Sequence, residues 1–250
     1  MVKQALVLIF LVVIGGIAGC SAPEKKKPPQ GESHYMLGLS YFRQQQLTQA
    51  LKEFLQAVES DPQNADYQNA LAQAYQFKKA YPEAEKHYLD AVNFSGNSPE
   101  YQNNLAALYL DMQRWDDAIK YFRQAAANLL FGNPEIALTG IGFAYFQKGE
   151  YPDAVGAYQE AIKKNARYPV AHLRLGEVYY ELDKWELAIE SFRKAVELVP
   201  TYLDAHYKLG LAYMKNRQND EAKQAFAEVV RLAPISELAK QAKAYIELLK

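Results

Sequence analysis

This chain of 250 residues contains a single cysteine, Cys20. No intramolecular disulfide can form, so the fold depends on packing alone. Charge of one sign is not in excess either, because 28 Lys and Arg residues stand against 29 Asp and Glu residues. Without a basic surplus we expect no nucleic-acid partner, since binding to phosphate backbones rests on clustered Lys and Arg side chains. A hydrophobic content of 50% still allows a sizeable core.

Long hydrophobic runs are also missing, apart from one at the beginning of the chain. Lys3 precedes an apolar run over residues 5–14, and small residues follow it as far as Cys20. The run is shorter than the roughly 20 residues that a membrane-spanning helix needs. This order of regions predicts a lipoprotein signal peptide over residues 1–19. An uncleaved membrane anchor with an incidental cysteine is the alternative interpretation.

The sequence Ile17-Ala18-Gly19-Cys20 resembles the bacterial lipobox. The resemblance implies that the Cys20 thiol carries lipid and that the mature chain is held on a membrane without spanning it. Ser21 stands where an aspartate would, in similar enterobacterial lipoproteins, specify the inner membrane. We therefore expect the outer membrane, on its periplasmic face. Residues 20–30, rich in Lys and Pro, are predicted to form a flexible tether behind the lipidated cysteine.

The remaining sequence repeats itself with a period of 34 residues. All six blocks carry tyrosine at position 11 and alanine at position 20, while position 8 is Gly or Ala and position 24 is Phe or Tyr. A period of this length predicts stacked helical repeats. The third block has two extra residues, and the six blocks are 31–64, 65–98, 99–134, 135–168, 169–202 and 203–234.

Small residues at positions 8, 20 and 27 with large residues at 7, 11 and 24 resemble the signature of the tetratricopeptide-repeat family. The resemblance covers residues 31–234 and implies an all-α fold, a right-handed superhelix of six helix-turn-helix repeats. Each repeat buries its apolar face against its neighbours, so the last repeat needs a cap. Apolar residues at helical spacing over residues 235–250 predict a C-terminal capping helix.

In this family the first helices of the repeats line a concave surface, and positions 2, 5, 6, 9, 12 and 13 are expected to face it. An exposed stripe of many apolar side chains there predicts a groove that binds a protein partner. The predicted groove residues are Tyr35, Met36, Leu39, Phe42, Asn69, Gln73, Phe77, Asn103, Asn104, Phe143, Phe146, Tyr180 and Tyr207. The same positions also hold Leu110, Ile136, Leu173, Leu211 and Met214. Superhelical curvature that buries some of these side chains against neighbouring repeats is the alternative.

Three of the predicted groove residues are asparagines. Asn69, Asn103 and Asn104 are candidate clamps for an extended peptide, because an amide pairs with both a backbone N–H and a C=O. Solvated surface residues are the other interpretation. The cationic clamp of chaperone-binding tetratricopeptide domains is missing, since Tyr35 and Leu39 stand in place of its lysine and asparagine. A charged C-terminal tail is therefore not the expected ligand.

The sequence contains no arrangement typical of an enzyme. We find no nucleophile paired with a base, no phosphate-binding loop and no dinucleotide fingerprint. His34, His172 and His206 share position 4 of their repeats, which predicts packing. Metal binding is not expected, because equivalent sites in neighbouring repeats are separated by at least about 8 to 10 Å. We expect a non-enzymatic protein without metal, cofactor or small-molecule substrate.

The irregular passage between the third and fourth repeats carries a second resemblance. Residues 125–151 read AAANLLFGNPEIALTGIGFAYFQKGEY. Together with the lipobox, the six repeats and the asparagine pair in the third repeat, this passage is similar to the outer-membrane pilotin lipoproteins of type IV pili. That resemblance implies a protein that carries the pilus secretin to the outer membrane and promotes its multimerisation. The alternatives are a periplasmic scaffold for β-barrel, polysaccharide or peptidoglycan machinery, and an activator of a peptidoglycan enzyme.

Overall fold

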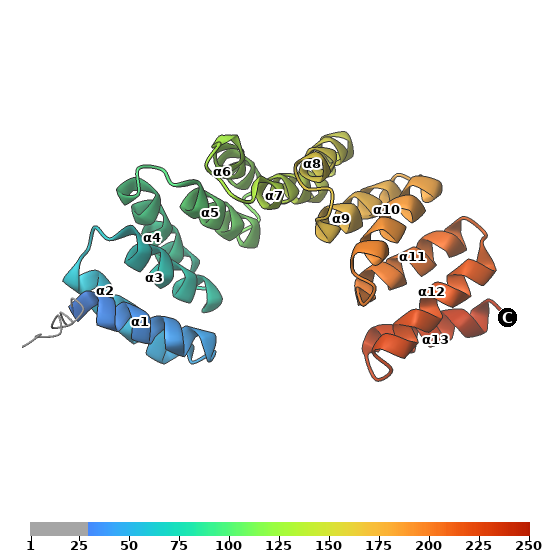
Figure 1. The fold of residues 1–250 in the computed structure, drawn as a ribbon, viewed down its shortest axis with the longest axis horizontal. Coiled ribbons are helices and arrows are strands. Elements are labelled where there is room, and N and C mark those ends of the chain that lie inside the picture. Colours follow the sequence, from blue (N-terminus) through green and yellow to red (C-terminus); the bar gives the residue numbers. More distant parts are fainter. Residues whose placement is uncertain (1–29) are drawn as a thin grey trace, which may run out of the picture.

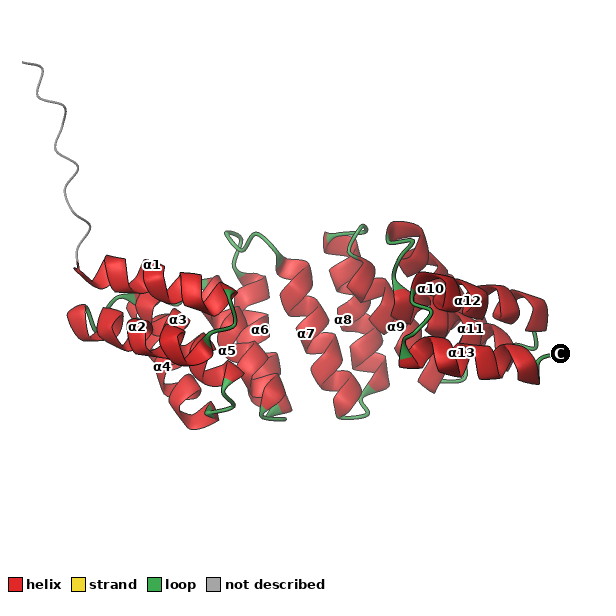
Figure 2. Ribbon diagram, turned by 90° about the horizontal axis from the view of Figure 1, so that it is seen from below, coloured by secondary structure: helices red, strands yellow, loops and turns green. Residues whose placement is uncertain are grey.

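The computed structural model describes residues 30–250. The predicted signal peptide, Cys20 and nearly all of the predicted tether lie outside these residues. Within them the protein is all-α, without strands, and its first twelve helices form six antiparallel pairs (Figure 2). The helices are α1 (Gln30–Arg43), α2 (Leu47–Ser60), α3 (Ala65–Phe77), α4 (Tyr81–Phe94), α5 (Pro99–Asp111), α6 (Trp115–Ala127), α7 (Pro134–Gln147), α8 (Tyr151–Lys164), α9 (Pro169–Glu181), α10 (Trp185–Leu198), α11 (Leu203–Lys215), α12 (Asn219–Leu232) and α13 (Glu237–Leu248).

The six pairs stack side by side into an open arch (Figure 1). The first helices of the pairs, from α3 to α11, lie on the inside of the arch, and their partners from α4 to α10 lie on the outside. All substantial contacts join helices that are adjacent or next but one in the chain. The predicted tetratricopeptide architecture of six repeats and a cap is confirmed, with the capping helix α13 packed on α12.

Small residues at position 8 allow the two helices of a pair to approach closely. A Cβ atom on Gly176 would lie 2.6 Å from two ring carbons of Phe192, the position-24 residue of the same repeat. A Cβ atom on Gly38 would meet Phe54 in the same way. The alanines at position 20 are fully buried in all six repeats. The same close-packed contact occurs in all four repeats that have glycine at position 8.

Each first helix ends in the same turn. Position 15 adopts a positive φ in all six repeats, with φ of 58° at Gln113 and 76° at Gly149. The N–H of the following residue donates to the carbonyl of the position-11 tyrosine, as Arg114 does to Tyr109 at 2.9 Å. This closure satisfies carbonyls that the end of a helix leaves free. Only the fourth repeat places glycine at this left-handed position.

The two extra residues of the third repeat lie in the connection between α6 and α7. Phe131 is turned into the core, whereas Leu129 is 99% exposed and Leu130 87% exposed. The Oδ1 atom of Asn128 accepts a 2.9 Å hydrogen bond from the N–H of Leu130 and stabilises the turn. The connection therefore projects two leucines into solvent.

The C-terminal helix closes the array. Ser236 caps α13, because its Oγ accepts the N–H of Ala239 at 3.1 Å. Tyr245 of α13 stacks on Phe226 of α12 with ring centroids 5.1 Å apart. The last repeat thus buries its apolar face as the earlier repeats do. Within residues 30–250 no helix has the length and apolar character needed to cross a membrane.

Candidate protein-binding groove

Polar contacts between successive first helices run along the inner side of the arch. Nδ2 of Asn104 donates to Oδ1 of Asn69 at 2.9 Å, which joins α5 to α3. Near the other end, Nζ of Lys208 in α11 lies 3.3 Å from a carboxylate oxygen of Glu177 in α9. The inner side therefore carries side chains from several repeats next to one another, as the sequence predicts for positions 5, 6 and 9.

The first two repeats present an apolar patch at the predicted groove positions, in which two side chains are exposed and two are half-buried. We call it the N-terminal patch: Met36, Leu39, Phe42 and Phe77. Phe77 is 65% exposed and Met36 57% exposed. The ring of Phe42 meets that of Phe77 edge to face, with centroids 5.1 Å apart, so Phe77 is held in position although it faces solvent. Exposed aromatic side chains held in this way are common anchors in protein interfaces.

Tyr35 lies beside the N-terminal patch but takes part in packing between repeats. Its ring centroid lies 5.1 Å from that of Tyr67 in α3 and 6.3 Å from that of Phe54 in α2. Burial is the main reason that the pKa of Tyr35 is raised above its usual value, with the nearby Asp66 carboxylate contributing. For Tyr35 the contacts agree with the alternative interpretation, in which the curvature of the array buries the side chain against the neighbouring repeat.

The centre of the inner face is polar. Asn69 and Asn104 form the amide pair described above, and Gln73 is half-buried one turn along α3. Asn103 differs from them, because its Oδ1 is buried and has no hydrogen-bond partner among the described residues. Thr139 is at the equivalent position 5 of the next repeat, and its hydroxyl is also buried without a hydrogen-bond partner among the described residues. The structure thus separates Asn103, which turns inward, from the other two asparagines.

A hollow of about 240 Å³ lies on the inner face of repeats 4 to 6. Phe143, Phe146 and Tyr180 line it, as predicted. Its four charged members were not among the predicted groove residues, although they occupy positions 6, 9 and 13: Arg174, Glu177, Glu181 and Lys208. The guanidinium of Arg174 lies 2.8 Å from a carboxylate oxygen of Glu177 and 5.6 Å from the ring centroid of Phe143. The expectation that positions 2, 5, 6, 9, 12 and 13 face the concave surface includes these charged residues.

Several predicted groove aromatics also pack against their own or the next repeat. Phe146 lies 5.7 Å from Tyr151, and Tyr180 lies 5.0 Å from Trp185, measured between ring centroids. Tyr207 packs on Phe226 at 5.8 Å, and its hydroxyl donates to Oε1 of Gln241 at 2.8 Å. Each of these rings is half-buried, so one part of the ring supports the fold and the rest is accessible.

The expectation that Leu173 faces the groove is wrong. Its side chain is only 4% exposed and belongs to the core formed by α9, α10 and α11. Position 5 lies at the boundary between the inner face and the contact with the next repeat. Ala205 of α11 belongs to the same buried core as Leu173. Position 5 is therefore a less reliable indicator of the groove than positions 6 and 9.

The histidines support the connections between repeats. His172 and His206 are buried, and their Nε2 atoms lie 3.0 Å from the Ala166 carbonyl and 2.8 Å from the Pro200 carbonyl. Both contacts reach back six residues, so the predicted packing role is confirmed for these two. His34 instead pairs with Glu53 at 2.7 Å. In the part of the chain that the structure describes, no three His, Cys, Asp or Glu side chains are grouped to hold a metal ion.

Family models for tetratricopeptide repeats match most of the chain. One matches residues 35–102, a second matches 99–128 and 203–235, and a third matches 142–183 and 176–216. No curated protein has a matching sequence.

Solved structures share the fold at low sequence identity. PilW, described as a widely conserved type IV pilus biogenesis factor, is 21% identical with a TM-score of 0.77, covering 87% of this chain and 100% of its own. PilF of Pseudomonas aeruginosa is 19% identical with a TM-score of 0.72, covering 86% of this chain and 97% of its own. YrrB, described as a tetratricopeptide protein with an unusual peptide-binding site, is 19% identical with a TM-score of 0.55, covering 76% of this chain and 97% of its own. From its repeat pattern, its paired helices and these matches, the chain belongs to the tetratricopeptide-repeat family.

Proposed function

We propose that this protein is a non-enzymatic, lipid-anchored scaffold that binds a segment of a type IV pilus secretin in its concave groove. The observation that carries the proposal is the N-terminal patch, in which Phe77 is exposed yet held by Phe42. A solvent-facing aromatic pair of this kind is costly unless a partner covers it. The function is therefore to hold a client protein in place.

The groove offers two chemically different halves to the client. The N-terminal patch suits apolar anchors at helical or extended spacing. The hollow of repeats 4 to 6 combines Phe143 with two basic and two acidic side chains: Arg174, Lys208, Glu177 and Glu181. Between them, the amides of Asn69 and Asn104 suit the backbone of the client. We infer a client segment with apolar residues at one end and paired charges at the other.

The pilus secretin is the client that the similarities favour. The two pilus biogenesis proteins share the whole array, and the lipobox at Cys20 provides the means to reach the outer membrane. In this proposal, lipid on Cys20 selects the membrane and the groove holds secretin subunits until they assemble. More than one acyl chain makes such anchoring stable.

The test is deletion of the gene in its own host, followed by gel analysis of unboiled outer-membrane fractions probed for the secretin. We expect loss of the heat-resistant multimer, restored by the wild-type chain. Cys20→Ala should leave the protein folded but absent from the outer membrane, and should not restore the multimer. An unchanged multimer after deletion would contradict the secretin assignment, and outer-membrane Cys20→Ala protein would contradict the anchoring.

A further inference from the structure

The connections between helices differ in character on the two edges of the array. Because the helices alternate in direction, the connections between repeats lie on one edge and those within repeats on the other. Figure 2 shows the α6–α7 and α8–α9 connections side by side along its upper edge. In the described residues, three large apolar side chains are at least 87% exposed, and all three are in connections between repeats: Leu129, Leu130 and Ile235.

The start of the described chain lies on the same edge. A Cβ atom on Gly31, the second residue of α1, would come within 3.1 Å of Cβ of Ser60 and 3.2 Å of a ring carbon of Tyr67. Ser60 ends α2 and Tyr67 lies in the first turn of α3, so α1 begins beside the first connection between repeats. The edge that carries the exposed leucines is thus the edge from which the chain leads back to Cys20.

The next connection along this edge, between α8 and α9, exposes basic residues. Residues 118–134 and 161–176 contain no Asp or Glu, and Lys163, Lys164 and Arg167 are all exposed at the end of α8 and in the α8–α9 connection. Nδ2 of Asn165 donates to Oε1 of Glu135 at 2.9 Å, which places this basic segment against the start of α7. Glu135 itself is buried. Glu160, one turn before Lys163 on α8, is the nearest exposed acid in the sequence. The exposed leucines of one connection and the exposed basic residues of the next therefore lie along the same edge of the array (Figure 2).

We propose that Leu129 and Leu130 form a finger that inserts into the surface of an anionic lipid bilayer, with Lys163, Lys164 and Arg167 contacting the headgroups. A protruding apolar tip beside basic residues fits an interfacial contact with anionic lipid. A loop of two leucines is too small for a stable protein interface, which buries about 800 Å² on each partner.

The length of chain before α1 supports this assignment. The ten residues from Cys20 to Gln30 span at most about 35 Å when fully extended, so lipid on Cys20 keeps this edge close to the membrane. This step rests on the proposed lipidation, and the finger then adds a second contact at high effective concentration. The consequence is a fixed orientation, with the edge of the array on the bilayer and the groove accessible from the side.

The test uses the full chain carrying Leu130→Cys, labelled with an environment-sensitive fluorophore and added to phosphatidylethanolamine vesicles containing phosphatidylglycerol. We expect a blue-shifted, brighter emission that is quenched by spin-labelled lipid. The matched control is Leu248→Cys, because Leu248 is also exposed but lies at the far end of α13, on the opposite edge. Wild-type chain treated with the same reagent measures any signal from Cys20.

The readout is the emission of the label at residue 130 and not the secretin multimer, so failure of this proposal can be distinguished from failure of the secretin assignment. Lys163→Gln/Lys164→Gln should weaken the response, since each basic residue near the surface contributes about a fivefold gain in partition. An equal response at residues 130 and 248 would overturn the proposal. A response at residue 130 that requires the secretin and not the vesicles would also overturn it, in favour of a protein contact.

Discussion

The side-chain amide of Asn104 donates a 2.9 Å hydrogen bond to that of Asn69, across the interface between α5 and α3. The bond uses one donor of Asn104 and the acceptor of Asn69. Among the described residues, Nδ2 of Asn69 and Oδ1 of Asn104 form no hydrogen bond. These two atoms are the donor and acceptor that a peptide group in the groove requires.

Asn104→Ala is expected to weaken binding of the client segment about fivefold, because one neutral hydrogen bond is worth about 1 kcal/mol. The free energy of unfolding should change by no more than about 1 kcal/mol, since Asn104 is half-buried and has a single partner. Titration calorimetry with a secretin peptide and urea denaturation measure the two quantities. Asn93→Ala, at an exposed position on α4, is the matched control and should change neither. Equal affinities of the wild type, Asn104→Ala and Asn93→Ala would show that the amide pair does not contact the client.

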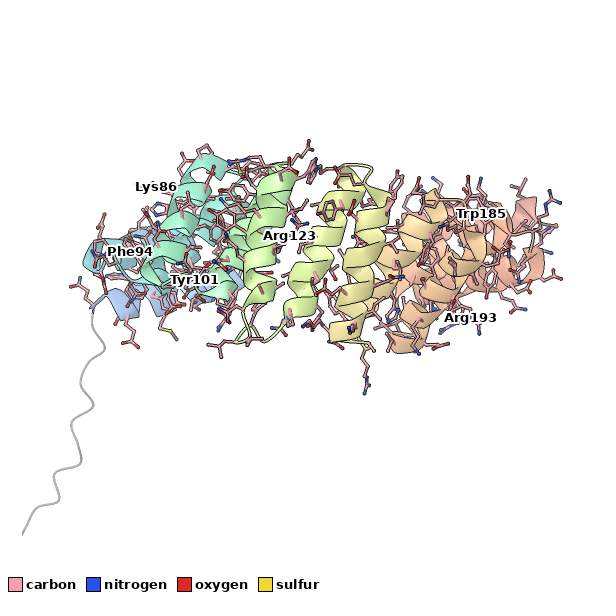
Figure 3. All side chains as sticks on the ribbon, turned by 90° about the horizontal axis from the view of Figure 1, so that it is seen from above. Lys86, Phe94, Tyr101, Arg123, Trp185 and Arg193 are labelled. Atoms are coloured by element: carbon pink, nitrogen blue, oxygen red, sulfur yellow. The ribbon has the colours of Figure 1, made fainter. Side chains whose placement is uncertain are left out.

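Phe77→Glu is expected to reduce client binding at least about tenfold, as loss of an interface anchor does. Its side chain is largely exposed, so the urea midpoint should stay nearly unchanged. Phe42→Glu is a less clean test, because Phe42 also packs on Phe54 with centroids 6.3 Å apart. Phe94→Glu, on the outer helix α4 (Figure 3), provides an exposed aromatic control. Binding by Phe77→Glu at wild-type strength would show that the N-terminal patch is not used.

Gly176→Ala is expected to destabilise the protein by about 1 to 3 kcal/mol, since the new methyl group would overlap the buried Phe192 ring. Gly156→Ala makes the same chemical change at an exposed position of α8 where a Cβ atom meets nothing within 4 Å. There alanine should stabilise the helix by about 0.5 to 1 kcal/mol. Urea denaturation of both variants gives opposite signs if position 8 is a packing site. Equal shifts would mean that the glycine is retained for another reason.

The turn at position 15 offers a second stability test. Gln113 has a φ of 58°, which costs a non-glycine residue about 1 kcal/mol, so Gln113→Gly should raise the free energy of unfolding by up to that amount. Gly149→Ala should lower it by a similar amount, because Gly149 has a φ of 76°. Both residues are exposed, so packing contributes little. Calorimetric melting temperatures that move in the same direction for both variants would contradict this reasoning.

Acidification is expected to destabilise the second repeat through His87. Burial, followed by the charge of Lys86, lowers the pKa of His87 below its usual value. Its Nδ1 lies 2.6 Å from Oε1 of Gln68, and its ring stacks on Tyr75. The unfolded chain binds the proton more tightly, so this contribution is lost as the pH falls through about 6.5. Urea midpoints between pH 7.5 and 5 should decline less steeply in His87→Gln, and an identical decline would contradict the assignment.

The repeat pattern predicts the fold because each signature position has the same packing role in the repeats. Glycine at position 8 meets the aromatic residue at position 24 in four repeats, and the alanine at position 20 is fully buried in all six. The groove is less predictable, because an inner-face position is shared between the client and the neighbouring repeat. Leu173 is buried whereas Phe77 is exposed, and their residue types do not distinguish them.

The charged hollow and the exposed leucines depend on neighbouring repeats in different ways. Helical spacing pairs Arg174 with Glu177 within α9, whereas Lys208 reaches Glu177 only because α9 and α11 pack next to each other. Leu129 and Leu130 lie outside the period, and their exposure depends on Phe131 filling the core in their place. In both cases the decisive information is the relation between neighbouring repeats.

Among the described residues, no substantial contact reaches beyond the next but one helix, so each repeat is held in place only by its neighbours. The mouth of the arch is open, so small rotations at successive repeat interfaces add up to a large change in curvature without breaking any single contact (Figure 1). A thick client would open the arch and a thin one would tighten it. The elastic stiffness of the stack then contributes to which clients fit, alongside the side chains that touch them.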